Sequence, residues 1–176
     1  IDFYFDLVSP YSYIASMLID DVARRGNAKV SWEPFLLGGV FKAVGTTEAP
    51  GLHPAKKPYL LKDLQRLSGH LKIPIKMPPD FPVRTVLAMR TLCGFNADEI
   101  PQAAQTLYKA YWVNNQDIAD PEVVASLVGR DAVERAGMQE IKDSLFQSTE
   151  EAVRRGAFGA PTFFVKDEMF FGHDRL

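Results

Sequence analysis

Thiols are almost absent from this sequence, which has one cysteine in 176 residues. That residue, Cys93, closes the apolar stretch Met89–Cys93 and is expected to be a small buried hydrophobic side chain. One cysteine excludes an internal disulfide and a thiol-rich metal centre, and we predict no metal site. No signal peptide is recognisable, although a chain that starts at Ile1 can have been trimmed, and we expect a cytoplasmic protein.

The chain also lacks a strong charge excess and any long apolar run. Its 20 Lys and Arg nearly balance its 22 Asp and Glu, for a formal net charge of −2. Without a basic stripe, nucleic acid is not expected as a partner. No apolar run approaches the roughly 18 residues of a membrane helix, so we expect no membrane partner. The hydrophobic fraction of 47% is enough for a substantial core.

The front of the chain predicts a β-α-β unit. Residues 2–8 and 29–36 are expected to form buried strands. Between them, apolar residues at helical spacing follow Pro10, which suits the first position of a helix. Ser9 is therefore the predicted N-cap of one helix that runs to the stop signal Arg24-Arg25-Gly26.

The middle of the chain is predicted to be helical. Residues 38–57 hold several glycines and prolines, which favour an irregular loop with one short helix. Further helices are expected from Pro58, from Pro82 or Val83, near 98–113, after Asp120 and near 139–155. Residues 162–165 and 169–171 predict a hairpin, and we expect a terminal helix to follow Leu176.

This order of elements predicts an α/β protein with a thioredoxin-like fold and an inserted all-helical domain. We assign residues 1–36 and 139–176 to the thioredoxin-like domain and 37–138 to the helical insertion. The total length suits one domain that carries such an insertion.

Ser9 is the first candidate functional residue. The first N–H groups of a helix lack partners and its dipole favours an anion, so a hydroxyl there faces a natural anion site. Its simplest role is to cap the helix. The three histidines have no sequence context that ties one of them to Ser9 as a base, so a hydrolase nucleophile is not indicated.

The segment Asp2–Tyr13, DFYFDLVSPYSY, resembles the opening of the 2-hydroxychromene-2-carboxylate isomerases. These are relatives of the kappa-class glutathione transferases within the DsbA-like group. In that group the position of Ser9 holds a redox cysteine or, in the glutathione-using branch, a serine, and Ser12 stands at the second cysteine of Cys-x-x-Cys. Without either sulfur, thiol–disulfide exchange is excluded on chemical grounds. The resemblance includes Lys57–Arg66, spans nearly the whole chain and implies a homodimer.

Glutathione is the cofactor that the resemblance implies, with its thiolate held by Ser9. Before the hairpin, Ala160-Pro161 matches the family's loop, in which the proline is cis and the preceding residue faces a thiol-bearing peptide. A second segment resembles the one that grips the γ-glutamyl end, where a carboxylate suits an ammonium group. It consists of Phe171, Gly172, His173 and Asp174. His173 departs from the asparagine or serine typical of the family.

The substrate that the resemblance implies is a small aromatic compound, through interconversion of 2-hydroxychromene-2-carboxylate and trans-o-hydroxybenzylidenepyruvate. Tyr11, Phe81 and Pro82 are candidates for its apolar wall. Lys42 is a candidate partner for its carboxylate, and is equally well explained as a solvated surface lysine. Two alternatives remain open: a kappa-like glutathione transferase acting on aromatic electrophiles, and a non-catalytic protein that binds thiols or peptides.

Overall fold

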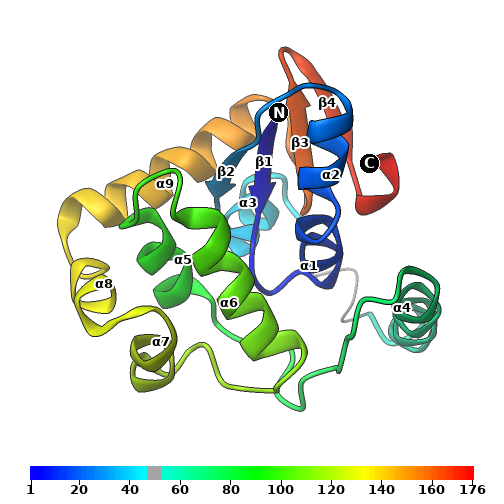
Figure 1. Ribbon diagram of the computed structural model, residues 1–176, viewed down its shortest axis with the longest axis horizontal. Helices are drawn as coiled ribbons and strands as arrows, with labels where there is room; N and C mark the ends of the chain where they lie inside the picture. Colours follow the sequence, from blue (N-terminus) through cyan, green and yellow to red (C-terminus); the bar gives the residue numbers. More distant parts are fainter. Residues whose placement is uncertain (47–52) are drawn as a thin grey trace.

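The computed structural model describes residues 1–46 and 53–176. Its centre is a sheet with the strand order β2-β1-β3-β4 (Figure 1). The strands are β1 (Asp2–Phe5), β2 (Ser31–Pro34), β3 (Thr162–Val165) and β4 (Glu168–Phe171). β1 pairs with β2 in parallel and with β3 antiparallel, and β3 and β4 form the predicted hairpin. The two ends of the chain therefore share one sheet.

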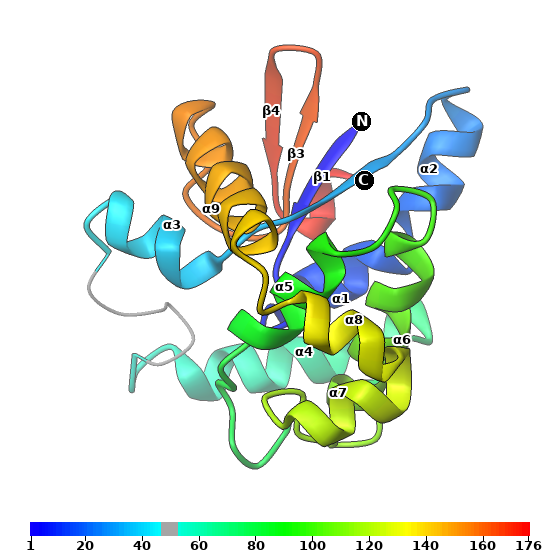
Figure 2. The same ribbon diagram turned by 90° about the vertical axis from the view of Figure 1, so that its left-hand side faces the viewer.

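Helices surround this sheet and extend beyond it. They are α1 (Pro10–Ser16), α2 (Ile19–Arg25), α3 (Leu37–Ala43), α4 (Lys57–Leu71), α5 (Val86–Cys93), α6 (Ile100–Trp112), α7 (Pro121–Val128), α8 (Arg130–Arg135), α9 (Gln139–Arg154) and the 3-10 turn η1 (His173–Arg175). Figure 2 shows α3 and α9 on one side of the sheet and α2 on the other. Within the described residues, no helix is long and apolar enough to cross a membrane.

Both faces of the sheet are buried, because successive side chains of a strand point to opposite faces. Phe3 and Phe5 face the main core, where Trp32 lies edge-on to both rings at 5.0 and 5.3 Å. Tyr4 faces the other side and packs against Phe35 and Phe164. This second cluster is closed by residues of α3 and α9.

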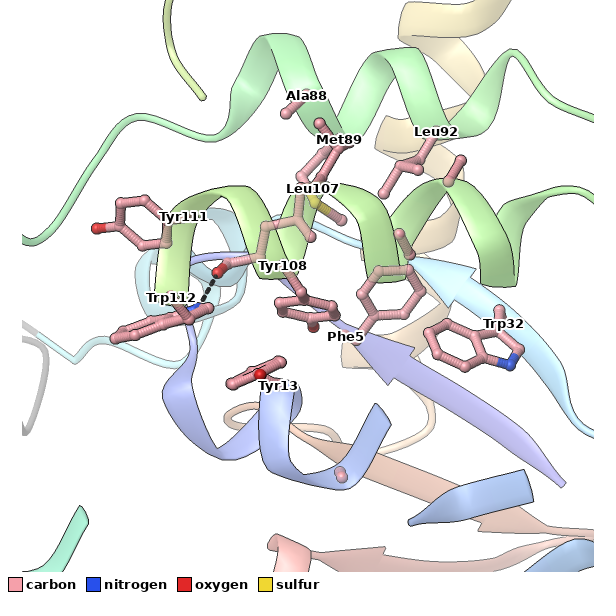
Figure 3. Close-up of a cluster of buried hydrophobic side chains, with 14 of the residues drawn as sticks. Phe5, Tyr13, Trp32, Ala88, Met89, Leu92, Leu107, Tyr108, Tyr111 and Trp112 are labelled. Carbon is pink, nitrogen blue, oxygen red and sulfur yellow. Dashed lines mark hydrogen bonds between the residues drawn. The ribbon is translucent and has the colours of Figure 1, made fainter. Parts of the chain in front are cut away.

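Helix α6 packs against the sheet and against α1. Figure 3 shows Tyr108 between Phe5 and Tyr13, with ring centroids 6.0 and 5.6 Å away. The buried indole of Trp112 donates a hydrogen bond from Nε1 to the Leu7 carbonyl at 2.9 Å. Because Leu7 lies between β1 and α1, this bond fixes the segment that leads to Ser9.

Several predicted elements differ in their limits. The helix expected from Pro10 to Arg25 is broken, because Ser16 donates from Oγ to the Tyr13 carbonyl at 2.7 Å and the N–H of Met17 bonds to a carbonyl only three residues back. The helix expected at Pro82 begins at Val86, since the Val83 N–H donates to the Tyr111 hydroxyl. The short helix α8 was not predicted.

Other expectations are confirmed. Asp120 caps α7 by accepting from the Glu122 N–H at 2.8 Å. The short helix expected after residue 38 is α3, and residues 47–52 of the predicted loop lie outside the described residues. α3 packs against α9. The division into a thioredoxin-like domain and a helical insertion at residues 37–138 stays a prediction.

Candidate functional site

A cavity of about 940 Å³ opens beside the start of α1, within the size range of small-molecule sites. Its walls come from the segment before α1, from α3 and α4, from residues 77–86 and from the loop before β3, and most are apolar. The sequence-predicted site residues that line it are Ser9, Tyr11, Phe81, Pro82, Ala160 and Phe171. Tertiary structure thus assembles one site from residues far apart in the chain.

Ser9 is the N-cap of α1, as predicted, and only 4% of its surface is exposed. Its Oγ accepts from the Ser12 N–H at 3.1 Å and donates to the Ala160 carbonyl at 3.1 Å. The Ala160–Pro161 peptide bond is cis, also as predicted. The serine hydroxyl and the proline loop therefore meet at the wall of the cavity.

The second position of the Cys-x-x-Cys spacing does not face this cavity. Ser12 is fully buried, and its Oγ has no hydrogen-bond partner within the described residues. No cysteine occurs among the described residues that line the cavity. Cys93 lies partly buried in α5, where burial raises the pKa of its thiol to about 12.

The end of β4 is tied to the proline loop. The Gly172 N–H donates to the Pro161 carbonyl at 3.0 Å. Gly172 has φ +99°, a backbone conformation that residues with a side chain rarely adopt, so this turn favours glycine. The next residue, His173, stacks on Tyr11 with ring centroids 5.1 Å apart and an interplanar angle of 12°. The predicted γ-glutamyl segment therefore lies against α1.

Burial controls the charge of this stacked pair. It lowers the pKa of His173, with Asp174 and Asp63 acting in the opposite direction. It also raises the pKa of Tyr11 to about 12, with further contributions from Asp63 and Tyr59. At neutral pH the phenol is therefore protonated and the imidazole is mainly neutral.

The cations of the cavity differ from the predicted one. Lys42 lies exposed on α3 and lines a separate, smaller pocket, and its contact with the substrate stays a prediction. Lys57 and Arg84 line the cavity instead, and the sequence analysis missed both roles. Their only sequence signal was position, since Lys57 starts α4 and Arg84 follows Phe81-Pro82.

Asp6 is a further lining residue that the sequence analysis missed. Its carboxylate accepts from the Val8 N–H at 3.1 Å and from the Leu37 N–H at 2.9 Å, and its surface is 1% exposed. Burial raises the pKa of this carboxyl group above its ordinary value of 3.8, against the effect of the two N–H donors.

Asp6 should make folding stability depend on pH. Because its pKa is higher in the folded than in the unfolded state, its contribution is favourable near pH 3.8 and is lost as the pH rises through the folded pKa. We expect the free energy of unfolding of the wild type, minus that of Asp6→Asn, to fall as the pH rises from about 4 through the folded-state pKa. Urea denaturation across this range measures the difference; a constant or rising value would contradict the prediction.

The family follows from comparison with known proteins. A sequence model of the DSBA-like thioredoxin domain matches residues 1–176. The chain belongs to this family. The thioredoxin-like fold predicted from the sequence is confirmed.

Relatives within the family carry two kinds of name. Human glutathione S-transferase kappa 1 is 31% identical over 197 residues, which cover 100% of this chain and 87% of the human protein. The 2-hydroxychromene-2-carboxylate isomerase of Sphingobium xenophagum is 29% identical over 187 residues, covering 100% and 93%. A solved 2-hydroxychromene-2-carboxylate isomerase has a TM-score of 0.87 at 26% identity, over 99% of this chain and 89% of that one. The predicted resemblance is thereby confirmed.

Proposed function

We propose that this protein is a glutathione-dependent isomerase that interconverts 2-hydroxychromene-2-carboxylate and trans-o-hydroxybenzylidenepyruvate. The observation that carries the proposal is Ser9, a hydroxyl in the wall of an apolar cavity that faces the Pro161 loop. The cavity lining that the structure describes has no thiol, so a thiol cofactor is needed for thiolate chemistry there. The relatives that are named 2-hydroxychromene-2-carboxylate isomerase support the same choice.

In this proposal the glutathione thiolate accepts the Ser9 hydrogen that Ala160 now receives. The N–H of Tyr11, which has no partner inside the helix, is a second donor at the start of α1. A free thiol with a pKa near 8.5 is only a few per cent thiolate at pH 7. Lowering that pKa by about two units corresponds to roughly 2.7 kcal/mol in favour of the thiolate.

The protein offers a charged partner for each end of the glutathione molecule. Asp174 is proposed to pair with the γ-glutamyl ammonium, while backbone groups of Gly172 and His173 meet its carboxylate. The backbone of Ala160 pairs with the central cysteine residue. Lys57 or Arg84, the cations of the cavity wall, suits the glycyl carboxylate or that of the substrate.

The chemistry is a reversible addition. In 2-hydroxychromene-2-carboxylate the ring C–O bond of the hemiketal first breaks, the hydroxyl proton passes to the released phenolate, and a ketone forms. The thiolate then forms a bond to the conjugated carbon of this ring-opened substrate, and the π electrons of the double bond move towards the ketone oxygen. The former double bond then rotates as a single bond. When the electrons return, the carbon–sulfur bond breaks and glutathione is released unchanged. Tyr11, Phe81 and Pro82 hold the aromatic ring of the substrate. The rate acceleration comes mainly from keeping the thiolate and the substrate in reacting geometry.

The test is ultraviolet-monitored interconversion of 2-hydroxychromene-2-carboxylate with and without glutathione. We expect turnover only when glutathione is present. Conjugation of an aromatic electrophile without isomerisation would favour the transferase, which the name of the human relative supports. Calorimetric binding of glutathione without either reaction would indicate a non-catalytic thiol-binding protein.

The homodimer stays a prediction, which light scattering of the purified protein checks.

A further inference from the structure

A second cavity, of about 420 Å³, lies among residues of α3, α5 and α9. Leu36 and Gly39 line both this cavity and the Ser9 cavity. Its charged lining consists of Lys42, Arg90 and Lys142 against one carboxylate, Glu150. The cavity therefore carries an excess of positive charge, and nothing in the proposed isomerase chemistry uses it.

Arg90 is the residue that points to a ligand. Its Nε is fully buried and, within the described residues, has no hydrogen-bond partner. None of the salt bridges found there involves Arg90, Lys42 or Lys142. Buried donors in folded proteins almost always have an acceptor, and an unmade bond is most costly for a charged group. An anionic oxygen that reached the Arg90 guanidinium would give it an acceptor and offset part of the positive charge of the cavity.

The other polar side chain of the wall is already occupied. Thr149 accepts the Leu36 N–H at 3.0 Å and donates from Oγ1 to the Leu145 carbonyl at 2.8 Å. Recognition of an anion in this cavity is therefore left to the cations. The planar guanidinium of Arg90 suits the two parallel oxygens of a carboxylate.

Apolar side chains complete the cavity and define the body of the ligand. Leu36, Ala43, Leu145 and Phe146 line it, and 63% of the Phe146 surface is exposed. A bare inorganic anion would leave this apolar surface uncovered, whereas a single ring would cover it. The volume is within the range of small-molecule sites.

From these features we propose that the second cavity binds a small organic carboxylate with an aromatic or branched apolar body, held by Arg90, Lys42 and Lys142. Lys42 is thus a carboxylate partner in this cavity rather than in the Ser9 cavity. The proposal does not depend on the isomerase reaction, because Arg90, Lys42 and Lys142 have no role in the proposed thiolate chemistry.

Benzoate is the probe for this site. Titration of the ¹⁵N-labelled protein at constant ionic strength is expected to give saturable NMR shifts at the amides of Ala43, Arg90 and Thr149 and at Arg90 Nε–H. Benzamide, the uncharged analogue of benzoate, should bind at least tenfold more weakly. Equal binding of benzamide, or shifts confined to residues of the Ser9 cavity such as Tyr11 and Lys57, would overturn the proposal.

Variants separate the site from general surface charge. Arg90→Gln and Lys142→Gln are each expected to weaken benzoate binding at least tenfold, and Lys142→Gln decides the matter if Arg90→Gln does not fold. Glu150→Gln should strengthen binding severalfold, because it removes the opposing carboxylate. Arg84→Gln, in the Ser9 cavity, should leave benzoate binding here unchanged. Equal affinities in wild type, Lys142→Gln and Glu150→Gln would also overturn the proposal.

Discussion

Replacing Ser9 by alanine should lower glutathione-dependent turnover by about 10- to 100-fold. A hydrogen bond to a charged group is worth roughly 1.5–3 kcal/mol, and each 1.4 kcal/mol is a factor of about ten. Ser9 Oγ lies at the cavity wall beside Ala160, where a bound thiolate would accept its hydrogen. The measurement is kcat/KM at saturating glutathione, with calorimetric glutathione affinity beside it.

The same substitution also removes a helix cap. Loss of the bond from the Ser12 N–H to Ser9 Oγ should cost about 1 kcal/mol of stability, which leaves the protein folded in the assay. Ser12→Ala is the matched control, because the hydroxyl it removes is buried and has no partner within the described residues. It should change turnover by less than about threefold. Unchanged turnover in Ser9→Ala, or an equal loss in both variants, would remove Ser9 from the mechanism.

Replacing Trp112 by alanine should have the largest effect on folding, lowering the free energy of unfolding by about 3–5 kcal/mol. The indole is completely buried, packs against Tyr111 and Phe81 at centroid distances of 4.9 and 5.9 Å, and donates to the Leu7 carbonyl. Its loss leaves a cavity and a buried carbonyl without this donor. Guanidinium denaturation followed by far-ultraviolet circular dichroism measures the effect.

Trp112→Phe separates the hydrogen bond from the packing of the ring, and Phe146→Ala is the control for loss of an exposed aromatic ring. Trp112→Phe keeps most of the ring but removes Nε1, so it should cost about 1–3 kcal/mol. Phe146→Ala removes a mainly exposed aromatic ring and should change stability by less than about 0.5 kcal/mol. If Trp112→Ala were no more destabilising than Phe146→Ala, then the packing and the hydrogen bond of Trp112 would not stabilise the fold.

Local signals in the sequence were enough to predict several parts of this protein. The Ser9-Pro10 cap, the strand at 162–165 and the helical spacing of α4 each depend on residues close together in the chain. The same holds for Asp120 as the cap of α7. In each case the side chain or periodicity acts on its own segment, so no knowledge of the rest of the fold was required.

Tertiary structure alone decided which charged side chains meet which cavity. Lys42 and Lys57 both belong to the region after β2, but the directions of α3 and α4 place them in different cavities. Arg84 lines the Ser9 cavity because residues 82–85 continue as an irregular segment before α5 begins at Val86. Asp6 lines the same cavity and accepts a hydrogen bond from the N–H of Leu37, which lies 31 positions away. Such contacts join distant segments, and a sequence pattern carries no signal of their direction or distance.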